Sequence, residues 1–516
     1  MNLVDLVVGH PAGDRALHDA DGWHNWGEVR DRAAAAAAAL RHAGVGPGER
    51  VVMAWPASAG FVATYLGILA AGAVAVPLNP ASPALELASE MRAVSPALAV
   101  GAGGGVSRLA DAARMLDRAV PVLASDGGGG DWDEAVHAAA ASGAAPHLHP
   151  VDRLEDDVAV LLFTSGTAGA PKPAMLTHGN ITANLAQLRA VPGLSARPDD
   201  VGLAALPLFH VFGLNVALGL CFATGGPLVV SERFDPDATL RQVRDHRVTV
   251  VVGVPAAFAL WLRHLDAGAV AGVDPRPLSS VRLAVVGGAP VAPGVAVAAE
   301  ERLGVVLHEG YGLTEAAPAV TATVADMRPE PGAVGRPLPG IEVRLVDEGG
   351  MDALVGDPGE IWVRGPNVFP GYWGDDQASA SVLAAGGWLR TGDIGVSGAG
   401  GNLFVVGRCK DLIIVSGFNV YPGEVERVVA AVPGVAEVVV VGRPDPVSGE
   451  VVEAVVVAED PTRPPSDAAI KDHCAARLAH YKCPSVVRLV PALPRTVGGE
   501  AMRRAMRNGQ AAGPET

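Results

Sequence analysis

The run from Thr164 to Lys172 combines hydroxyl-bearing residues, glycines and a lysine, directly after the apolar run Val158 to Phe163. A buried strand followed by such a loop offers backbone N–H groups to phosphate oxygens. Its spacing differs from the Walker pattern, in which the lysine directly follows a glycine. A Gly-rich loop alone is often no more than a loop, so this segment indicates phosphate binding only in combination with others.

A second segment, Gly310 to Glu315, follows the strand-like run Val305 to Leu307. The ring of Tyr311 can cover a purine, the hydroxyl of Thr314 can donate to a phosphate oxygen, and the carboxylate of Glu315 can hold magnesium. The alternative interpretation is a turn with one core tyrosine.

Two later segments add further polar groups. The run Gly387 to Asp393 places Asp393 at the end of a predicted turn, where its carboxylate is suited to accept both hydroxyls of a ribose. The run Gly407 to Glu426 begins with the basic residues Arg408 and Lys410 and ends at a predicted helix start.

The elements that must position these groups are strands alternating with helices. Alanine-rich Glu28 to His42 predicts a helix. Val248 to Val254 and Val281 to Val286 predict buried strands, as does Val305 to Leu307, with a helix over Pro293 to Leu303. This order indicates an α/β fold with a parallel sheet.

A second lobe is expected at the C-terminal end. Strand-like Val435 to Gly442 and Val451 to Ala458 adjoin helical Pro422 to Ala431 and Asp467 to His480, which indicates a small α+β unit. We place the boundary near the charged cluster Arg408 to Asp411, giving domains 1–409 and 410–516.

Composition narrows the class of protein. The 516 residues are 49% hydrophobic and 18% charged, enough to bury cores in more than one lobe. A formal net charge of −16 with no long basic run argues against a nucleic-acid partner and favours a small-molecule substrate. The four cysteines show no CxxC spacing and indicate reduced thiols.

The start of the chain shows no signal-peptide pattern, so we expect a cytoplasmic protein. The most apolar stretch, Phe61 to Leu78, is interrupted by Gly72 and Pro77 and predicts a helix, a turn and a strand rather than a membrane span.

Taken together and in this order, the segments resemble the core motifs of the adenylate-forming superfamily, in its acyl-CoA synthetase branch. The resemblance extends over nearly the whole chain through PLFHVFG at 207–213, VVGGAP at 285–290, GRPLPG at 335–340, GEIWVRGPNVFPGYW at 359–373 and LPRTVGGEAMRR at 493–504.

The resemblance implies a large, multi-subdomain N-terminal domain and a small mobile C-terminal domain that rotates about a hinge at Lys410. It implies that a carboxylate and ATP first give an acyl-adenylate and pyrophosphate, and that the thiol of coenzyme A then displaces AMP. Such an enzyme works by positioning and charge stabilisation.

The resemblance also assigns roles by position. His210 would be a gate between acyl pocket and CoA tunnel, and Glu315 would hold Mg²⁺ while ATP is present. The adenylate would contact Gly287, Gly288, Ala289, Glu309, Gly310, Tyr311, Gly312, Thr314, Asp393 and Arg408. The phosphate loop would comprise Thr164, Ser165, Gly166, Thr167, Gly169 and Lys172. The acyl pocket would draw on Phe209, His210, Gly213, Leu214 and Val254, and the CoA tunnel on Ser416, Gly417 and Phe418.

The sequence departs from the family at its last motif. The family pattern PRTxxGK reads PRTVGGE here, so Glu500 stands where the family has a lysine that bridges the carboxylate and the α-phosphate. At about 4 Å and an effective dielectric near 20, a lysine attracts a phosphate charge by about 4 kcal/mol and a glutamate repels it similarly. The phosphate loop also carries Ala168 in place of a hydroxyl residue, and Pro173 in place of a glycine.

We therefore expect an acyl-CoA ligase that forms a thioester from an acyl-adenylate of an apolar acid, with adenylation impaired and the adenylate supplied by a separate enzyme. In that case ATP and Mg²⁺ are not required. One alternative is a complete ATP-dependent synthetase in which Lys172 or Arg495 compensates. Others are an inactive acyl-adenylate-binding homologue and transfer to a carrier-protein thiol.

Overall fold

The computed structural model describes residues 1–126, 129–143, 147–164, 171–194, 196–197, 199–267, 276–324, 328–416, 418–445 and 448–494, with Arg503 and Met506 near the C-terminus. Several residues with predicted roles lie outside this part of the chain, namely Ser165, Gly166, Thr167, Ala168, Gly169, Gly417, Arg495 and Glu500.

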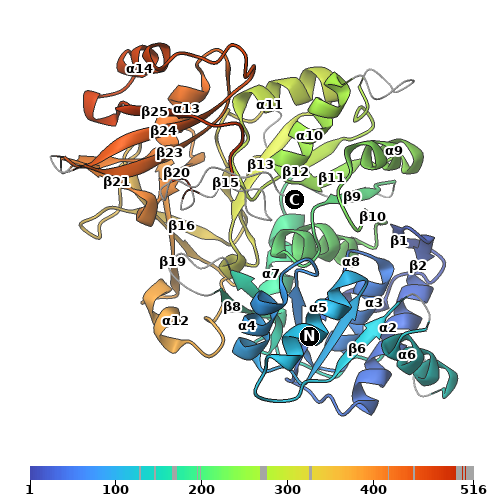
Figure 1. Cartoon of the computed structure of the whole chain (residues 1–516). Coiled ribbons are helices and arrows are strands. Elements are labelled where there is room, and N and C mark those ends of the chain that lie inside the picture. Colours follow the sequence, from blue (N-terminus) through green and yellow to red (C-terminus); the bar gives the residue numbers. More distant parts are fainter. Residues whose placement is uncertain are drawn as a thin grey trace.

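The largest sheet in the described part of the chain has nine strands (Figure 1). They are β1 (Arg15–Asp19), β2 (Gly22–Asn25), β9 (Gly202–Ala205), β10 (Leu228–Val230), β11 (Val250–Gly253), β12 (Leu283–Val286), β13 (Leu307–Gly312), β14 (Ala319–Ala322) and β15 (Arg336–Pro337). The order β15-β14-β13-β12-β11-β9-β10-β1-β2 is parallel from β13 to β1, which confirms the predicted α/β fold.

Helices cover both faces of this sheet. On one face lie α9 (Pro236–His246), α10 (Pro255–Asp266), α11 (Pro293–Ala298) and the π-helix η2 (Ala299–Leu303). On the other lie α7 (His178–Arg189), the π-helix η1 (Phe212–Gly219) and α8 (Leu220–Thr224). The helix predicted over Pro293 to Leu303 is therefore α-helical only in its first half.

A second sheet, in the order β6-β5-β3-β4-β7-β8, forms the lower part of the molecule in Figure 1. Its strands are β3 (Arg50–Ala54), β4 (Val74–Leu78), β5 (Leu98–Ala102), β6 (Val122–Ser125), β7 (Val158–Thr164) and β8 (Lys172–Thr177). Near it lie α1 (Asp5–Val8), α2 (Trp26–His42), α3 (Ala59–Ala70), α4 (Ala84–Val94), α5 (Gly104–Arg114) and α6 (Asp131–Ala141).

The predicted alanine-rich helix is α2, which starts in a capping box in which Asn25 and Glu28 bond each other's backbone N–H groups. Its alanines allow close packing with α3: a Cβ at Gly67 would lie 2.6 Å from the Cβ of Ala36. The stretch Phe61 to Leu78 forms α3, a turn and β4, as predicted. None of the described helices is long and apolar enough to cross a bilayer.

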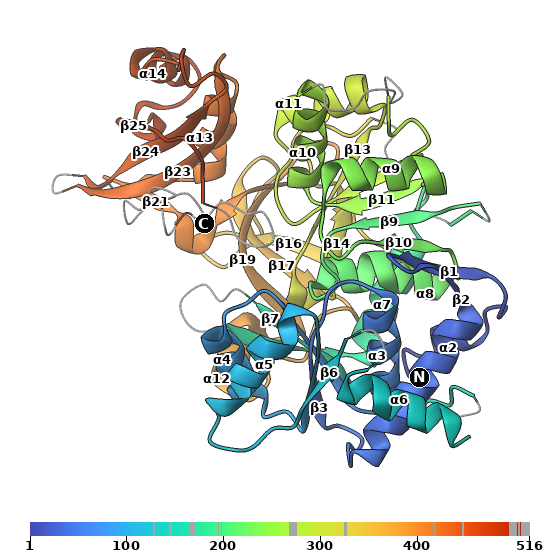
Figure 2. The same cartoon turned by 45° about the vertical axis from the view of Figure 1, so that its right-hand side comes forward.

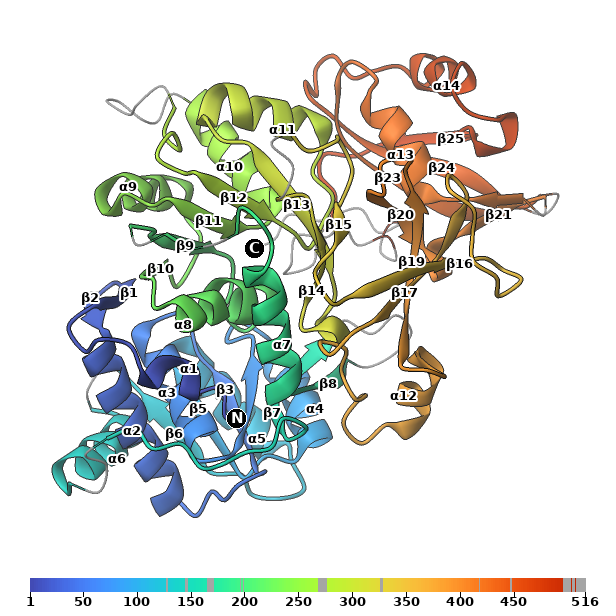
Figure 3. The ribbon, with the colours of Figure 1, turned by 180° about the vertical axis from the view of Figure 1, so that it is seen from behind.

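A third, antiparallel sheet joins these lobes to the C-terminal region (Figure 3). It contains β16 (Glu342–Val346), β17 (Pro358–Arg364), β18 (Leu383–Ala384), β19 (Trp388–Ser397) and β20 (Leu403–Arg408), with α12 (Asp376–Val382) beside it. Asp393 was predicted at the end of a turn. It lies inside β19 instead, because it pairs with Arg408 of β20.

The C-terminal residues form a fourth sheet with its own core, seen as a separate orange-to-red lobe in Figure 2. Its elements are η4 (Cys409–Asp411), β21 (Ile413–Val415), β22 (Phe418–Val420), α13 (Pro422–Ala430), β23 (Val435–Asp445), β24 (Gly449–Ala458), α14 (Asp467–Ala475), η5 (His480–Lys482) and β25 (Val486–Leu489). The predicted boundary at 409/410 falls between this sheet and the third one. Helix α14 ends before the predicted His480.

Candidate active site

A cavity of about 2600 Å³ lies where the carboxyl ends of the parallel strands face the third sheet and the C-terminal lobe. Clefts at this edge are the usual binding sites of α/β sheets. Many of the predicted residues line it: Thr164, Lys172, Phe209, His210, Val254, Gly287, Gly288, Ala289, Glu309, Gly310, Tyr311, Gly312, Thr314, Glu315, Asp393, Arg408 and Lys410. The structure thus brings together residues that are far apart in the sequence.

One end of this cleft is formed by the turn after β12. Gly288 has a φ of +84°, in the left-handed region that favours glycine, so the turn exposes backbone rather than side chain to the cavity. Glu309, on β13, accepts a hydrogen bond from the N–H of Val291 at 3.2 Å. Burial raises the pKa of Glu309 to about 7.

The predicted ribose-binding acid sits in a buried network. The Tyr311 hydroxyl donates to Oδ2 of Asp393 at 2.7 Å, and Nε of Arg408 lies 3.1 Å from Oδ1. Burial raises the pKa of Asp393, while Arg408 opposes that shift. Each carboxylate oxygen keeps a second lone pair for a ligand hydroxyl. Tyr311 belongs to β13, which continues past its pairing with β12 and pairs there with β14. This pairing fixes the Tyr311 ring at the cavity wall.

Glu315 lies on η3 (Thr314–Ala316), beside Thr314 and facing the same cavity. Tyr372 donates its hydroxyl to Oε1 of Glu315 at 2.6 Å, and burial raises the pKa of the carboxyl group. A buried carboxylate with lone pairs left over suits a hard divalent cation. Among the described residues, no group of three or more His, Cys, Asp or Glu side chains is arranged to hold a metal ion, so substrate phosphates and water would have to complete such a site.

The predicted phosphate lysine follows the loop on strand β8. Nζ of Lys172 lies 3.2 Å from Oδ2 of Asp375 and 5.6 Å from the centre of the Tyr372 ring. Both charged side chains are 40% exposed, so the pair is weak and Lys172 can exchange partners.

Pro173 also lies in β8, rather than in the loop where the sequence analysis placed it. It is opposite Phe163 of β7, and its carbonyl accepts from the N–H of Trp373 at 2.8 Å. Because β8 is the edge strand of its sheet, a proline that lacks an N–H donor is tolerated there.

His210 is exposed to the cavity, where its Nδ1 accepts from the N–H of Phe212 at 3.3 Å. Desolvation by the surrounding protein lowers its pKa, so the ring is neutral at pH 7.

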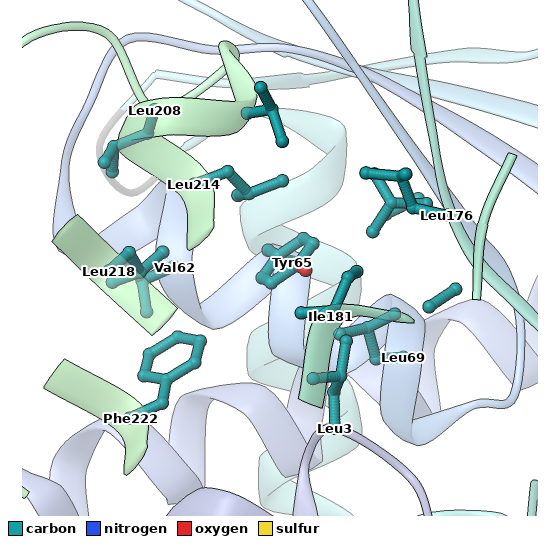
Figure 4. Close-up of a cluster of buried hydrophobic side chains, with 14 of the residues drawn as sticks. Leu3, Val62, Tyr65, Leu69, Leu176, Ile181, Leu208, Leu214, Leu218 and Phe222 are labelled. Carbon is teal, nitrogen blue, oxygen red and sulfur yellow. The ribbon is translucent and has the colours of Figure 1, made fainter. Parts of the chain in front are cut away.

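Two residues predicted for the acyl pocket do not face the cavity. Gly213 packs on backbone, since a Cβ there would lie 2.2 Å from the carbonyl oxygen of Pro207. Leu214 is buried in the main core, near Tyr65 and Leu208 in Figure 4. In the same helix Phe212, Val216 and Ala217 line the cavity instead.

The described part of the predicted CoA loop lies on the outside of the C-terminal lobe. Ser416 has a φ of +50° and donates its N–H to the carbonyl of Ser448 at 2.8 Å. The Phe418 ring stacks on Tyr481 at 4.7 Å between centroids and is 55% exposed. Neither residue lines the cleft in this arrangement, whereas Lys410 does.

Sequence reasoning missed several contacts of the site. Tyr372 belongs to the GYW run but was given no role, and Asp375 was not identified. Arg503 of the last motif holds α13, because its Nη2 lies 2.6 and 2.7 Å from the two carboxylate oxygens of Glu426. The signal that could have found Arg503 was its place beside Glu500 in that motif.

The cleft and its lobes match known proteins. Residues 5–373 match the family model described as AMP-binding enzyme, and residues 424–500 match the AMP-binding enzyme C-terminal domain. The chain is 37% identical over 487 residues to a feruloyl-CoA synthase of an Amycolatopsis species, covering 93% of each chain. It is 40% identical over 364 residues to a long-chain-fatty-acid–CoA ligase of Yersinia pestis, covering 69% of this chain and 62% of that enzyme.

The fold also matches the crystal structure of ATP-bound MatB from Rhodopseudomonas palustris, with a TM-score of 0.89, 33% identity and 99% of each chain covered. Both the residues that line the cleft and the C-terminal lobe fall within these matches. The chain belongs to the family of AMP-binding enzymes.

Proposed function

We propose that the protein forms an acyl-CoA thioester from the acyl-adenylate of an apolar carboxylic acid held in this cleft. The observation that carries the proposal is the buried network of Tyr311, Asp393 and Arg408 next to the Gly288 turn. A carboxylate flanked by a phenol and a guanidinium, beside exposed backbone at a strand end, suits the ribose and base of an adenylate. The relatives, named as CoA ligases, support coenzyme A as the acceptor.

In the thioester-forming step the CoA sulfur attacks the carbonyl carbon of the adenylate. A C–S bond forms, the bond from that carbon to the phosphate oxygen breaks, and AMP leaves with the electron pair while the thiol proton passes to solvent. The neutral ring of His210 adds no charge to the cavity, which suits its proposed role as a gate. A rotation about Lys410 would bring the hairpin of Ser416 and Phe418 to the cleft.

We further propose that Glu500 slows the preceding step, in which a carboxylate attacks the α-phosphate of ATP. Both reactants are anions, and a third negative charge near them raises the barrier that the family's lysine lowers. A loss of about 4 kcal/mol corresponds to roughly a thousandfold in rate. Magnesium at Glu315 would supply charge neutralisation to this step alone, and a separate adenylating enzyme would supply the adenylate.

The second candidate is a complete ATP-dependent acyl-CoA synthetase. The curated relatives favour it, because they are named as CoA ligases and synthases without a missing half-reaction. The weakly held Lys172 also favours it, since this cation can turn from Asp375 to a phosphate. The location of Pro173 in an edge strand removes one of the reasons for expecting damage to phosphate handling.

The two candidates differ in the substrates that give product. The purified protein is mixed with CoA and either synthetic acyl-adenylates or the free acids with ATP and Mg²⁺, across a panel of apolar acids, and acyl-CoA and pyrophosphate are followed. We expect acyl-CoA from the adenylates at a rate at least about 100-fold above that from acid and ATP. Comparable rates would establish the complete synthetase, and adenylate binding without any acyl-CoA would indicate an inactive binding homologue.

A further inference from the structure

The proposed hinge lies between two ion pairs. On its N-terminal side, Arg408 ends strand β20, and its Nε lies 3.1 Å from Oδ1 of Asp393. On its C-terminal side, Nη1 of Arg503 lies 3.8 Å from Oδ2 of Asp411. In the sequence, residues 409–410 alone separate the two paired positions. The chain is therefore held by charged partners on both sides of a very short segment.

Arg503 is itself held by the C-terminal lobe. Its Nη2 lies 2.6 Å from Oε1 and 2.7 Å from Oε2 of Glu426 on α13. The same Oε1 accepts from the N–H of Val440, on strand β23, at 2.8 Å. A guanidinium that contacts both oxygens of a carboxylate is held in a more defined orientation than an ammonium group would be. Arg503 thus links the hinge to a helix and a strand of the lobe.

This charged group is partly shielded from water. The side chains of Asp411, Glu426 and Arg503 are 24%, 18% and 29% exposed. Fully exposed ion pairs contribute little, because solvent screens them and ordering two long side chains costs entropy. Removing one partner of a shielded pair has a larger effect, because it leaves the opposite charge without compensation. Loss of Arg503 would remove the shared cation from two carboxylates at once.

The anchor lies where the lobe meets the rest of the chain. Gly423, Glu426 and Arg427 line the cavity at the spacing of one helix face, and Arg503 lines it too. Gly423, in the first turn of α13, packs on the strand that leads into the hinge. A Cβ there would lie 2.4 Å from the carbonyl oxygen of Val406 in β20. Contacts of Arg503 are therefore placed to govern how the lobe turns.

We propose that Arg503 is a positioning residue that fixes the C-terminal side of the hinge, so that rotation of the lobe is confined to Cys409 and Lys410. The proposal rests on the proposed function, because it assumes that the lobe rotates to deliver the β21–β22 hairpin to the cleft. With Asp411 tied to α13, the lobe turns as one rigid body. Without Arg503, backbone rotation would spread into η4, and the alignment that CoA transfer needs would be lost.

The first test compares the parent protein with Arg503→Met, which removes the charge and keeps an unbranched side chain. Transfer to CoA is followed from a supplied acyl-adenylate, so the ATP half-reaction does not enter. We expect kcat to fall at least about tenfold, and the calorimetric Kd of the adenylate to change less than about threefold, because the residues proposed to hold the adenylate belong to the other side of the hinge. An unchanged kcat would overturn the proposal.

Two further variants separate positioning from a general effect on the lobe. Arg503→Lys keeps the charge and should recover at least about one third of the parent kcat. Arg443→Met changes an exposed arginine of β23 in the same lobe and should leave kcat unchanged. A loss in Arg443→Met equal to that in Arg503→Met would contradict a specific role of Arg503.

A double variant tests whether Arg503 acts through the hinge. Asp411→Asn removes the charge of its partner and should by itself lower kcat at least about fivefold. If both residues act through one contact, the kcat of Arg503→Met/Asp411→Asn should lie within about twofold of the slower single variant. Effects that multiply would overturn the proposal. Should Arg503→Met fail to fold, Asp411→Asn still tests the anchor, and an unchanged kcat in it would count against it.

Hydrogen exchange tests the anchor without any reaction. In the ligand-free protein, the amides of residues 409–415 should exchange at least about tenfold faster in Arg503→Met than in the parent, whereas those of β20 should not change. Equal exchange at residues 409–415 would overturn the proposal. Faster exchange in the variant, combined with no acyl-CoA from the parent protein, would support the anchor and contradict the proposed function alone.

Discussion

The cleft around Asp393 and the hairpin of Ser416 and Phe418 in the C-terminal lobe differ in how closely neighbouring groups surround them. In the cleft, Asp393 is 7% exposed and bonded to Tyr311 and Arg408. On the hairpin, Phe418 is 55% exposed with its ring stacked on Tyr481, and the N–H of Ser416 donates to the carbonyl of Ser448. The difference is what a preformed binding site and the proposed rotation of the C-terminal lobe would require.

One departure from the family falls in the C-terminal region. The residues assigned to base, ribose and metal are present in the cleft, whereas Glu500 belongs to the C-terminal segment of the sequence. We infer that binding of the adenylate is preserved and that its formation is slowed. The predictions below test this division, starting with the largest expected effect.

Restoring the lysine should have the largest effect. Glu500→Lys should raise the rate of acid-dependent ATP–pyrophosphate exchange by roughly a thousandfold, because it reverses the sign of a charge near the α-phosphate. The exchange rate of the neutral variant Glu500→Gln should fall between those of the parent protein and Glu500→Lys. Transfer from a supplied adenylate to CoA should change less than about threefold in either variant, since the segment would be turned away during that step. Equal exchange rates in all three proteins would show that Glu500 does not limit adenylation.

Disrupting the hydrogen-bond network of the cleft should weaken binding of the acyl-adenylate. Asp393→Ala removes the carboxylate that holds Tyr311 and Arg408 and would accept the ribose hydroxyls, so Kd for an acyl-adenylate should rise about 100-fold in calorimetry. Asp352→Ala is the matched control, because Asp352 accepts from Arg344 at 2.7 Å on the surface and is 67% exposed. A rise in Kd below about threefold for Asp393→Ala would place the ribose elsewhere.

A smaller effect concerns stability and the buried carboxyl group of Glu90. Glu90 on α4 is 8% exposed and lines the cleft, and its Oε2 lacks a hydrogen-bond partner in the described part of the structure. Burial raises its pKa from 4.5 to about 7. The folded state therefore holds the proton more tightly than the unfolded state, and the resulting stability is present below pH 4.5 and lost as pH rises through 7.

Glu90→Gln should remove the loss of stability that the parent protein shows as pH rises through 7. At pH 8 the variant should be more stable than the parent protein by up to about 3 kcal/mol, and at pH 5 the difference should largely disappear. The free energy of unfolding, measured by urea denaturation at pH 8 and pH 5, gives both differences in stability. The exposed Glu459, which is far from α4 in the sequence, supplies the control Glu459→Gln, for which little change is expected. A gain at pH 8 no larger than that of the control would mean that Glu90 is not a buried carboxylate.

Much of the fold follows from local sequence. The alanine-rich run over Glu28 to His42 became α2, and the valine-rich runs became β11, β12 and β23, because helix propensity and burial agree with the fold there. Strand β13 was harder to predict. Its polar end around Tyr311 is a strand because it pairs with β14, and such pairing partners are not encoded locally.

The site residues that belong to a chemical motif were predictable from the sequence. Residues whose orientation depends on packing were harder to predict. Asp393, Tyr311 and Arg408 were named from their motifs, and both Tyr311 and Arg408 lie within hydrogen-bonding distance of Asp393. Gly213 and Leu214 do not face the cavity, because packing of η1 against its neighbours decides which of its residues point outward, and the motif alone does not specify that. Tyr372 was missed because its partner, Glu315, is 57 residues away in the sequence.

The separation of the two half-reactions can be tested most directly by single-turnover kinetics with one acid, such as decanoic acid. Rapid quenching gives the rate constant for adenylate formation from acid, ATP and Mg²⁺, and separately that for thioester formation from the synthetic adenylate and CoA. We expect thioester formation to be at least about 100-fold faster than adenylate formation. Adenylate formation as fast as thioester formation would contradict this account and identify a complete synthetase that works with Glu500 in place of the lysine.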